Sequence, residues 1–96
     1  MRKYEALFMV KPDLNEGETK NLFQQINDTI TKNNGQVLSS GLYGQEKRKL
    51  CFPIKKFQEA IYYLVEFALE PPTINKIKAQ YRLNEGILRF LILVKD

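Results

Sequence analysis

The sequence predicts an α+β domain of the ferredoxin-like class, with the element order β-α-β-β-α-β and two helices on one face of a four-stranded antiparallel sheet. Two stretches carry apolar residues at helical spacing, and four others are rich in alternating, β-branched or aromatic residues. A right-handed crossover through each helix places both helices on the same side of the sheet. The first and third strands then become central, and residues 1–96 are expected to form a single domain.

The first predicted strand runs from the N-terminus to Val10 and is apolar on both faces from Ala6 onward. Ala6, Phe8 and Val10 alternate with Leu7 and Met9, and neighbouring side chains of a strand point to opposite faces. A strand with one face in water shows alternating polarity instead. This strand is therefore expected to be central and covered on both sides.

The first helix is predicted over about Glu16–Asn33. Asn15 followed by Glu18 resembles a capping box at its start. Gly35 is expected to adopt the left-handed conformation just past its end. Apolar residues recur at helical spacing between these limits: Leu22, Phe23, Ile26 and Ile30.

An interrupted second strand is predicted over Val37–Phe52, with Gly41 and Gly44 marking a bend or bulge. Pro53 has no N–H to donate and is expected to end this strand. A short loop then leads into the third strand, Ala60–Leu69, which is rich in aromatic and β-branched residues.

The second helix and the last strand complete the pattern. Thr73 is expected to cap the helix, which stops at Asn84, Glu85 and Gly86. The last strand is predicted over Ile87–Lys95, with Arg89 on the opposite face from Phe90.

The composition fits a globular domain without a metal or cofactor. The chain is 44% hydrophobic and 27% charged, and no apolar run approaches the roughly 20 residues of a membrane span. It has no histidine and a single cysteine, Cys51, so neither a metal site nor catalytic residues are expected. The lone cysteine fits a reducing compartment, and the net charge of +4 is a mild indication of an anionic partner.

Two helices can cover only one face of the predicted sheet, yet the other face also carries apolar side chains. Nothing within one copy of the chain covers that second face, so the pattern predicts a partner. The residues expected there are Leu7, Met9, Leu64, Leu91 and Leu93.

Three segments, taken in order, resemble one protein family. They are Arg2-x-Tyr4-Glu5 at the N-terminus, the basic run from Lys47 to Ile54, and Tyr81–Glu85 followed by Ile87–Arg89. Together they make nearly the whole chain similar to the sixth protein of the bacterial small ribosomal subunit. The resemblance implies a ferredoxin-like structural protein without enzymatic activity, in a cytoplasmic ribosome or, as an alternative that the sequence leaves open, in an organellar one. It also implies binding to small-subunit rRNA together with the eighteenth small-subunit protein as heterodimer partner.

The candidate site residues fall into two groups. Basic residues are expected to contact RNA phosphates, which makes binding sensitive to salt: Arg2, Lys3, Lys47, Arg48, Lys49, Lys55, Lys56, Arg82 and Arg89. Apolar and aromatic residues are expected at the protein-partner interface: Tyr4, Leu7, Met9, Tyr62, Leu64, Leu91 and Leu93.

Other interpretations remain open from the sequence. Lysines on an edge strand also serve to block aggregation. The same fold could be a homo-oligomeric small-molecule-binding or regulatory domain that hides its apolar face by pairing with itself. An acylphosphatase-like hydrolase is disfavoured, because an anion-cradling turn needs free N–H groups and the turn after the first strand contains Pro12 and Asp13.

Overall fold

The computed structural model describes the backbone of residues 1–42, 48–54 and 57–95, and the side chains of residues 1–42 and 59–95. Its elements follow the predicted order, with the second strand in two pieces. They are β1 (Arg2–Val10), α1 (Glu16–Lys32), β2 (Gln36–Leu42), β3 (Arg48–Ile54), β4 (Phe57–Leu69), a 3₁₀ turn (Pro71–Thr73), α2 (Ile74–Arg82) and β5 (Ile87–Val94).

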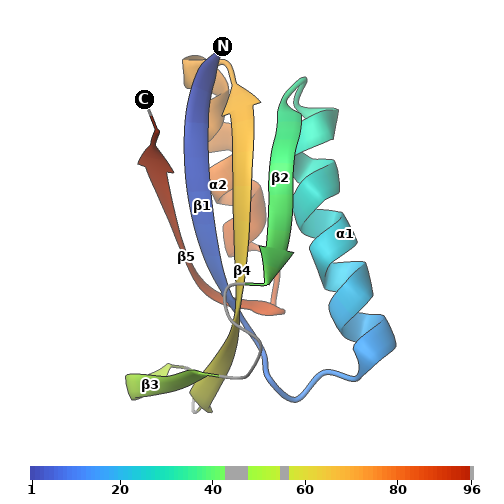
Figure 1. Cartoon of the computed structure of the whole chain (residues 1–96), viewed down its shortest axis with the longest axis vertical. Helices are drawn as coiled ribbons and strands as arrows, with labels where there is room; N and C mark the ends of the chain where they lie inside the picture. Colours follow the sequence, from blue (N-terminus) through green and yellow to red (C-terminus); the bar gives the residue numbers. More distant parts are fainter. Residues whose placement is uncertain (43–47, 55–56, 96) are drawn as a thin grey trace.

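The main sheet has the strand order β2-β4-β1-β5, and each neighbouring pair is antiparallel. Both helices lie on the same face of this sheet (Figure 1). The ferredoxin-like α+β class is therefore confirmed, with β1 and β4 as the central strands. The short strand β3 pairs with the first residues of β4, beyond the main sheet.

The second strand departs from its prediction in two ways. The register shift in β2 lies between Val37 and Ser39 rather than at Gly41, which pairs with Leu64 inside the strand. Gly44 lies outside the described residues. Pro53 does not end β3, which continues to Ile54. A proline is tolerated there because β3 pairs only with β4 in the described part of the chain, and its register shifts beyond Lys49.

The predicted ends of α1 are confirmed within one residue, but the left-handed residue is Asn34 instead of Gly35. The Asn15 side chain accepts a hydrogen bond from the Glu18 N–H at 2.8 Å. At the other end, Asn34 has φ 65°. The Gly35 N–H donates to the Ile30 carbonyl and the Asn34 N–H to the Thr31 carbonyl, which is the Schellman pattern.

Gly35 is needed for space rather than for a special φ. A Cβ at this position would lie 2.9 Å from the backbone oxygen of Ile30, and also 2.7 Å from Ile30 Cγ2 and 2.8 Å from Leu69 Cδ1. The chain therefore passes so close to the end of α1 and to β4 that only hydrogen fits.

The second helix begins without the predicted side-chain cap. Thr73 makes no capping hydrogen bond, and the preceding residues form a 3₁₀ turn that starts at Pro71. Proline suits the first position of such a turn because its missing N–H would have no partner there.

The core lies between the helices and the inward face of the sheet. Phe8, Val65 and Phe67 are fully buried, as are Ile26 on α1 and Ile77 on α2. Along β1 and β4, buried positions alternate with partly exposed ones. This alternation shows that the helices cover one set of side chains on each central strand and leave the other set outside the core.

Tyr81 ties the two helices together. Its hydroxyl donates a hydrogen bond of 2.8 Å to the Ile26 carbonyl on α1, and its ring packs edge-on against Phe8, with the centroids 4.8 Å apart. Burial raises the pKa of the Tyr81 hydroxyl above its ordinary value of 10.0, and the nearby Tyr63 raises it further.

This raised pKa predicts a pH-dependent effect of Tyr81→Phe. In alkaline solution the unfolded chain loses the Tyr81 proton first, so this contribution to stability begins to fall near pH 10.0 and is lost as pH rises toward the folded pKa. The variant should lose about 1 kcal/mol of stability near neutral pH, because the hydrogen bond is gone. Between about pH 8 and about pH 11, the free energy of unfolding measured in urea should fall less for the variant than for the wild type. An equal fall in both proteins would mean that Tyr81 is not the cause of the loss of stability at alkaline pH.

Candidate partner and RNA surfaces

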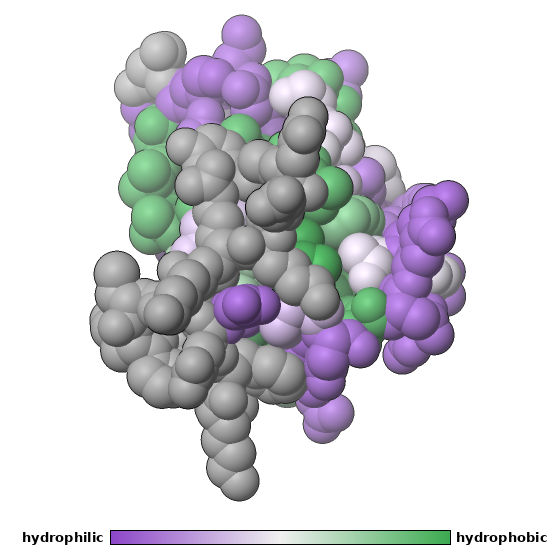
Figure 2. Space-filling view, turned by 60° about the horizontal axis from the view of Figure 1, so that its bottom comes forward, coloured by the Kyte–Doolittle hydropathy of each residue, from purple (hydrophilic) through white to green (hydrophobic). Residues whose placement is uncertain are grey.

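The sheet face without helices, called here the open face, has an apolar centre. Leu7 on β1 lies between Leu64 on β4 and Leu91 on β5 in the strand register. Leu91 is 54% exposed and Leu93 53% exposed, so neither is covered within the chain. Figure 2 shows apolar surface, in green, along the side of the molecule on which β5 runs in Figure 1. The predicted uncovered face is therefore present.

Sequence reasoning missed a charged cluster at one end of this face. Glu5 on β1 lies opposite Glu66 on β4, and Lys95 follows β5. The Lys95 Nζ lies 2.6 Å from Glu66 Oε1 and 3.6 Å from Glu5 Oε2. The hydrogen bond to Glu66 raises the pKa of the Lys95 ammonium. Like charges opposite each other destabilise a strand pair, and Lys95 offsets the repulsion between the two carboxylates.

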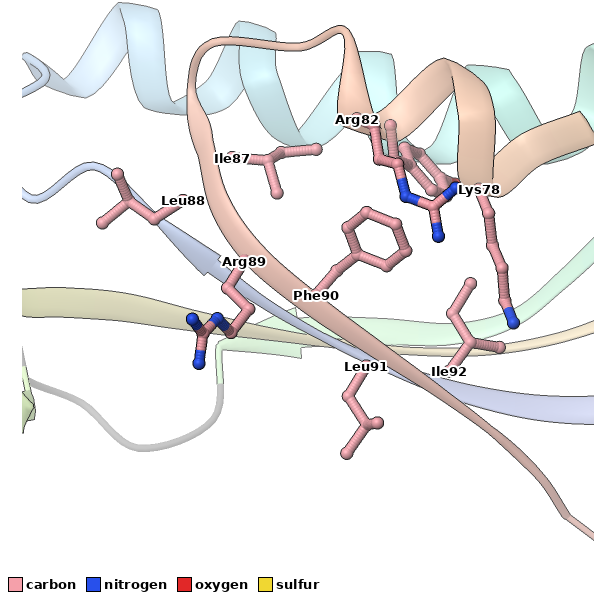
Figure 3. Close-up of a pocket in the computed structure, with 9 residues that line it drawn as sticks. Lys78, Arg82, Ile87, Leu88, Arg89, Phe90, Leu91 and Ile92 are labelled. Atoms are coloured by element: carbon pink, nitrogen blue, oxygen red, sulfur yellow. The ribbon is translucent and has the colours of Figure 1, made fainter. Parts of the chain in front are cut away.

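The other end of the open face carries Arg89. This residue lies opposite Met9 on β1, which lies in turn opposite Tyr62 on β4. Figure 3 shows Arg89 and Leu91 on the side of β5 away from α2. The open face is thus charged at both ends and apolar between them, as expected for a protein interface with an apolar core and a polar rim.

Tyr4 is a correction to the predicted interface. It is only 5% exposed and belongs to the core with Phe8 and Val65, and its ring stacks on Phe67 with the centroids 5.5 Å apart. The reason is the alternation of β1, because Tyr4 shares its face with Ala6 and Phe8 rather than with Leu7. The other predicted interface residues lie on the open face: Leu7, Met9, Tyr62, Leu64, Leu91 and Leu93.

The predicted RNA-binding residues do not form one patch. Arg2 and Lys3 are exposed at the start of β1, opposite the end of β4. Arg48 and Lys49 belong to β3 and pair with Ala60 and Glu59 near the start of β4, so the length of β4 separates the two groups. Lys47, Lys55 and Lys56 lie outside the described residues, and the side chains of Arg48 and Lys49 are not described.

Arg82 lies apart from both groups, at the end of α2. Its guanidinium carbon is 6.0 Å from the centre of the Phe90 ring. Together with Lys78 it borders a groove of about 360 Å³ between α2 and β5 (Figure 3). The sequence did not predict the contact between Arg82 and Phe90, because no local pattern shows that a residue at the end of a helix lies over the following strand.

The described part of the chain offers neither a metal centre nor a membrane-spanning helix. No group of His, Cys, Asp and Glu side chains there could hold a metal ion. None of the helices there has the length and hydrophobicity needed to cross a membrane.

The fold and the open face define a ferredoxin-like domain with an exposed apolar sheet face. The family model for ribosomal protein S6 matches residues 3–94. The chain therefore belongs to the ribosomal protein S6 family, whose members are proteins of the small ribosomal subunit. The predicted family is confirmed.

Individual relatives agree with this assignment. Small ribosomal subunit protein bS6 of Caldanaerobacter subterraneus is 36% identical over 100% of this chain and 99% of its own length. The protein of the same name from Aquifex aeolicus is 38% identical over 95% of this chain and 82% of its own. The crystal structure of 30S ribosomal protein S6 from Thermotoga maritima has a TM-score of 0.88 and 26% identity, covering 98% of this chain and 87% of that one.

A second solved structure shows how widely the fold is shared. The C-terminal domain of the MgtC protein from Mycobacterium tuberculosis has a TM-score of 0.64 at 10% identity, covering 99% of this chain and 88% of that one. That likeness concerns the fold alone.

Proposed function

We propose that this chain is a structural constituent of the small ribosomal subunit that binds small-subunit rRNA together with the eighteenth small-subunit protein. The observation that carries the proposal is the open face, with Leu7, Leu64, Leu91 and Leu93 gathered on a sheet that the helices cover only from behind. Membership of the S6 family supplies the ribosomal setting. No enzymatic step is part of the proposal.

The protein partner is expected to cover the open face. Burying a leucine side chain yields about 1.5–3 kcal/mol, and Leu91 and Leu93 are both more than half exposed in the chain alone. The Glu5–Lys95–Glu66 cluster and Arg89 would set the orientation of the partner, because charges at the rim of an interface favour one register over others.

The RNA is expected to contact the basic segment around β3. Lys47, Arg48 and Lys49 follow one another there, and the β3 backbone extends beyond the end of the main sheet, away from the centre of the open face (Figure 1). A partner on the open face would therefore leave this segment accessible to phosphates. Arg2 and Lys3 would form a second, separate contact at the far end of β1.

Replacing Lys47, Arg48 and Lys49 with glutamine is expected to flatten the salt dependence of rRNA binding by the chain together with its protein partner. The slope of log K against log salt should fall by about one for each phosphate that the variant no longer neutralises. Glutamine at Lys20, Lys32 and Lys76, which are exposed on the helices, makes a control with the same change in charge. An unchanged slope in the first variant, or an equal change in both, would remove the segment from the RNA site.

The open face also fits a second function, a homo-oligomeric regulatory domain that buries this face against a second copy. Size-exclusion chromatography of the pure chain separates the two functions. A stable dimer at micromolar concentration would favour self-pairing, if Leu91→Asp makes it dissociate into monomers. A monomer that forms a complex only with the second ribosomal protein favours the ribosomal role.

A further inference from the structure

We infer that the groove between α2 and the free edge of β5 binds an extended protein segment in which acidic and apolar residues alternate, and that this segment adds to the sheet as a further strand. The site lies at the edge of the sheet and is distinct from the open face and from the basic segment around β3. It assigns Arg82 to a protein ligand, so Arg82 leaves the proposed RNA surface.

The first observation is that β5 is an edge strand with an unprotected apolar stretch. It lies at the end of the strand order and pairs only with β1 in the described part of the chain. Residues Phe90–Val94 are all apolar. Natural edge strands of this length are usually blocked by charge, proline or a bulge within the exposed stretch, and here the bulge lies earlier, between Met9 and Val10 of β1.

The second observation is the direction of the backbone groups on β5. The Lys95 N–H donates to the Lys3 carbonyl at 2.8 Å, which makes these two residues a hydrogen-bonded pair. Bonded and non-bonded pairs alternate along an antiparallel ladder, so the pairs Leu93–Glu5 and Leu91–Leu7 are bonded as well. The N–H and carbonyl groups of Phe90, Ile92 and Val94 therefore point to the free edge, where an added strand can pair with them.

The third observation is the charge beside this edge. Lys78 and Arg82 extend from α2 over the side of β5 that carries Phe90 and Ile92 (Figure 3). No acidic side chain lines the groove among the described residues. Residues of an added strand that lie opposite Phe90 and Ile92 would point to this same side. Carboxylate side chains are expected at those positions, because the two cationic groups lie beside them.

The other side of the added strand would meet the edge of the open face. Its residues opposite Leu91 and Leu93 would lie beside these exposed leucines, so apolar side chains suit those positions. Acidic and apolar residues are therefore expected to alternate along the added strand, because one side of β5 faces two cations and the other side carries exposed leucines.

A second copy of this chain and an RNA strand fit the groove less well. Pairing β5 with its own copy would bring Lys78 and Arg82 of both copies to one interface, where like charges repel. RNA bases would need an open aromatic face for stacking, but the Phe90 ring is already contacted by Arg82, Tyr81 and Phe8. RNA would also leave the outward backbone groups of β5 without a regular set of partners.

The test uses the full chain and a synthetic peptide of about eight residues in which glutamate and valine alternate. Titration followed by NMR should shift the amide signals of Phe90, Ile92 and Val94 most strongly. Lys78→Gln combined with Arg82→Gln should weaken binding about tenfold. The control pair Lys20→Gln and Lys76→Gln, with the same net charge, should leave the affinity unchanged, and circular dichroism checks that both variants are folded.

Two N-methylated peptides test the added strand directly. Methylation of every second backbone nitrogen removes the donors on one edge of the peptide, so one of the two alternating sets should abolish binding and the other should be tolerated. Equal binding of both sets would overturn the inference, as would equal binding of a lysine–valine peptide. An RNA oligonucleotide whose affinity depends on Lys78 and Arg82 while the glutamate–valine peptide does not bind would overturn it in favour of RNA.

One variant separates this site from the proposed function. Leu64 lies on β4, two strands away from the free edge of β5. Leu64→Asp should weaken binding of the partner on the open face and leave peptide binding at β5 unchanged. Loss of peptide binding in this variant would mean that the peptide lies on the open face, and would overturn the edge site.

Discussion

Replacing Leu91 and Leu93 together with aspartate is expected to abolish association with the protein partner while the chain stays folded. Both side chains are more than half exposed, so the unbound fold loses little when they change. In the complex, each aspartate would place a charge where the partner buries apolar surface, and the affinity should fall more than about a hundredfold. Isothermal titration with the purified partner measures the affinity, and thermal unfolding of the free variant measures its stability.

Two results would count against the proposed interface. A large loss of stability in the unbound variant would mean that these leucines belong to the core. Full affinity in a folded variant would mean that the partner lies elsewhere. Leu83→Asp is a matched control, because this leucine is 83% exposed at the end of α2, on the helix side of the sheet, and its change should affect partner binding much less.

Substitutions at two neighbouring residues of β1 are expected to have different large effects, one on stability and one on partner binding, because the two side chains point to opposite faces. Phe8 is fully buried, and its ring contacts Tyr81 and Phe90. Phe8→Ala should lower the free energy of unfolding by about 3–5 kcal/mol through reduced burial and the cavity that remains. Leu7 is only partly buried on the open face, so Leu7→Ala should cost the free chain clearly less and should weaken partner binding instead.

Urea unfolding of the two variants, with and without the partner, measures both effects. The expected result is a crossed pattern, in which Phe8→Ala acts mainly on folding and Leu7→Ala mainly on association. Similar losses of stability for both variants in the free chain would contradict the division of β1 into a covered and an open face.

Local patterns in the sequence were sufficient for much of the fold. The spacing of Leu22, Ile26 and Ile30 predicted the buried stripe of α1, and all three are buried. The alternation along β1 and β4 predicted which side chains lie under the helices. Tyr4 was placed on the wrong face even though it has the same parity as Phe8, so the sequence already contained the information that corrects it.

Other features depended on residues that are far apart in the chain. Glu5, Glu66 and Lys95 meet only because the registers of β1 with β4 and of β1 with β5 bring them together. The close approach of Leu69 to Gly35 and the position of Arg82 over Phe90 likewise follow from packing between elements. No pattern within a single helix or strand reports such contacts.

The sequence by itself determined the kind and order of the elements and which side of each one is apolar, because helix and strand periodicity are properties of neighbouring residues. It also determined that one sheet face lacks a cover, since two helices are too few for both. Only the tertiary structure decided which charges gather at the ends of that face and which backbone groups of β5 remain outside the ladder. The physical reason is that strand register and the packing of α2 against β5 are set by contacts between distant segments.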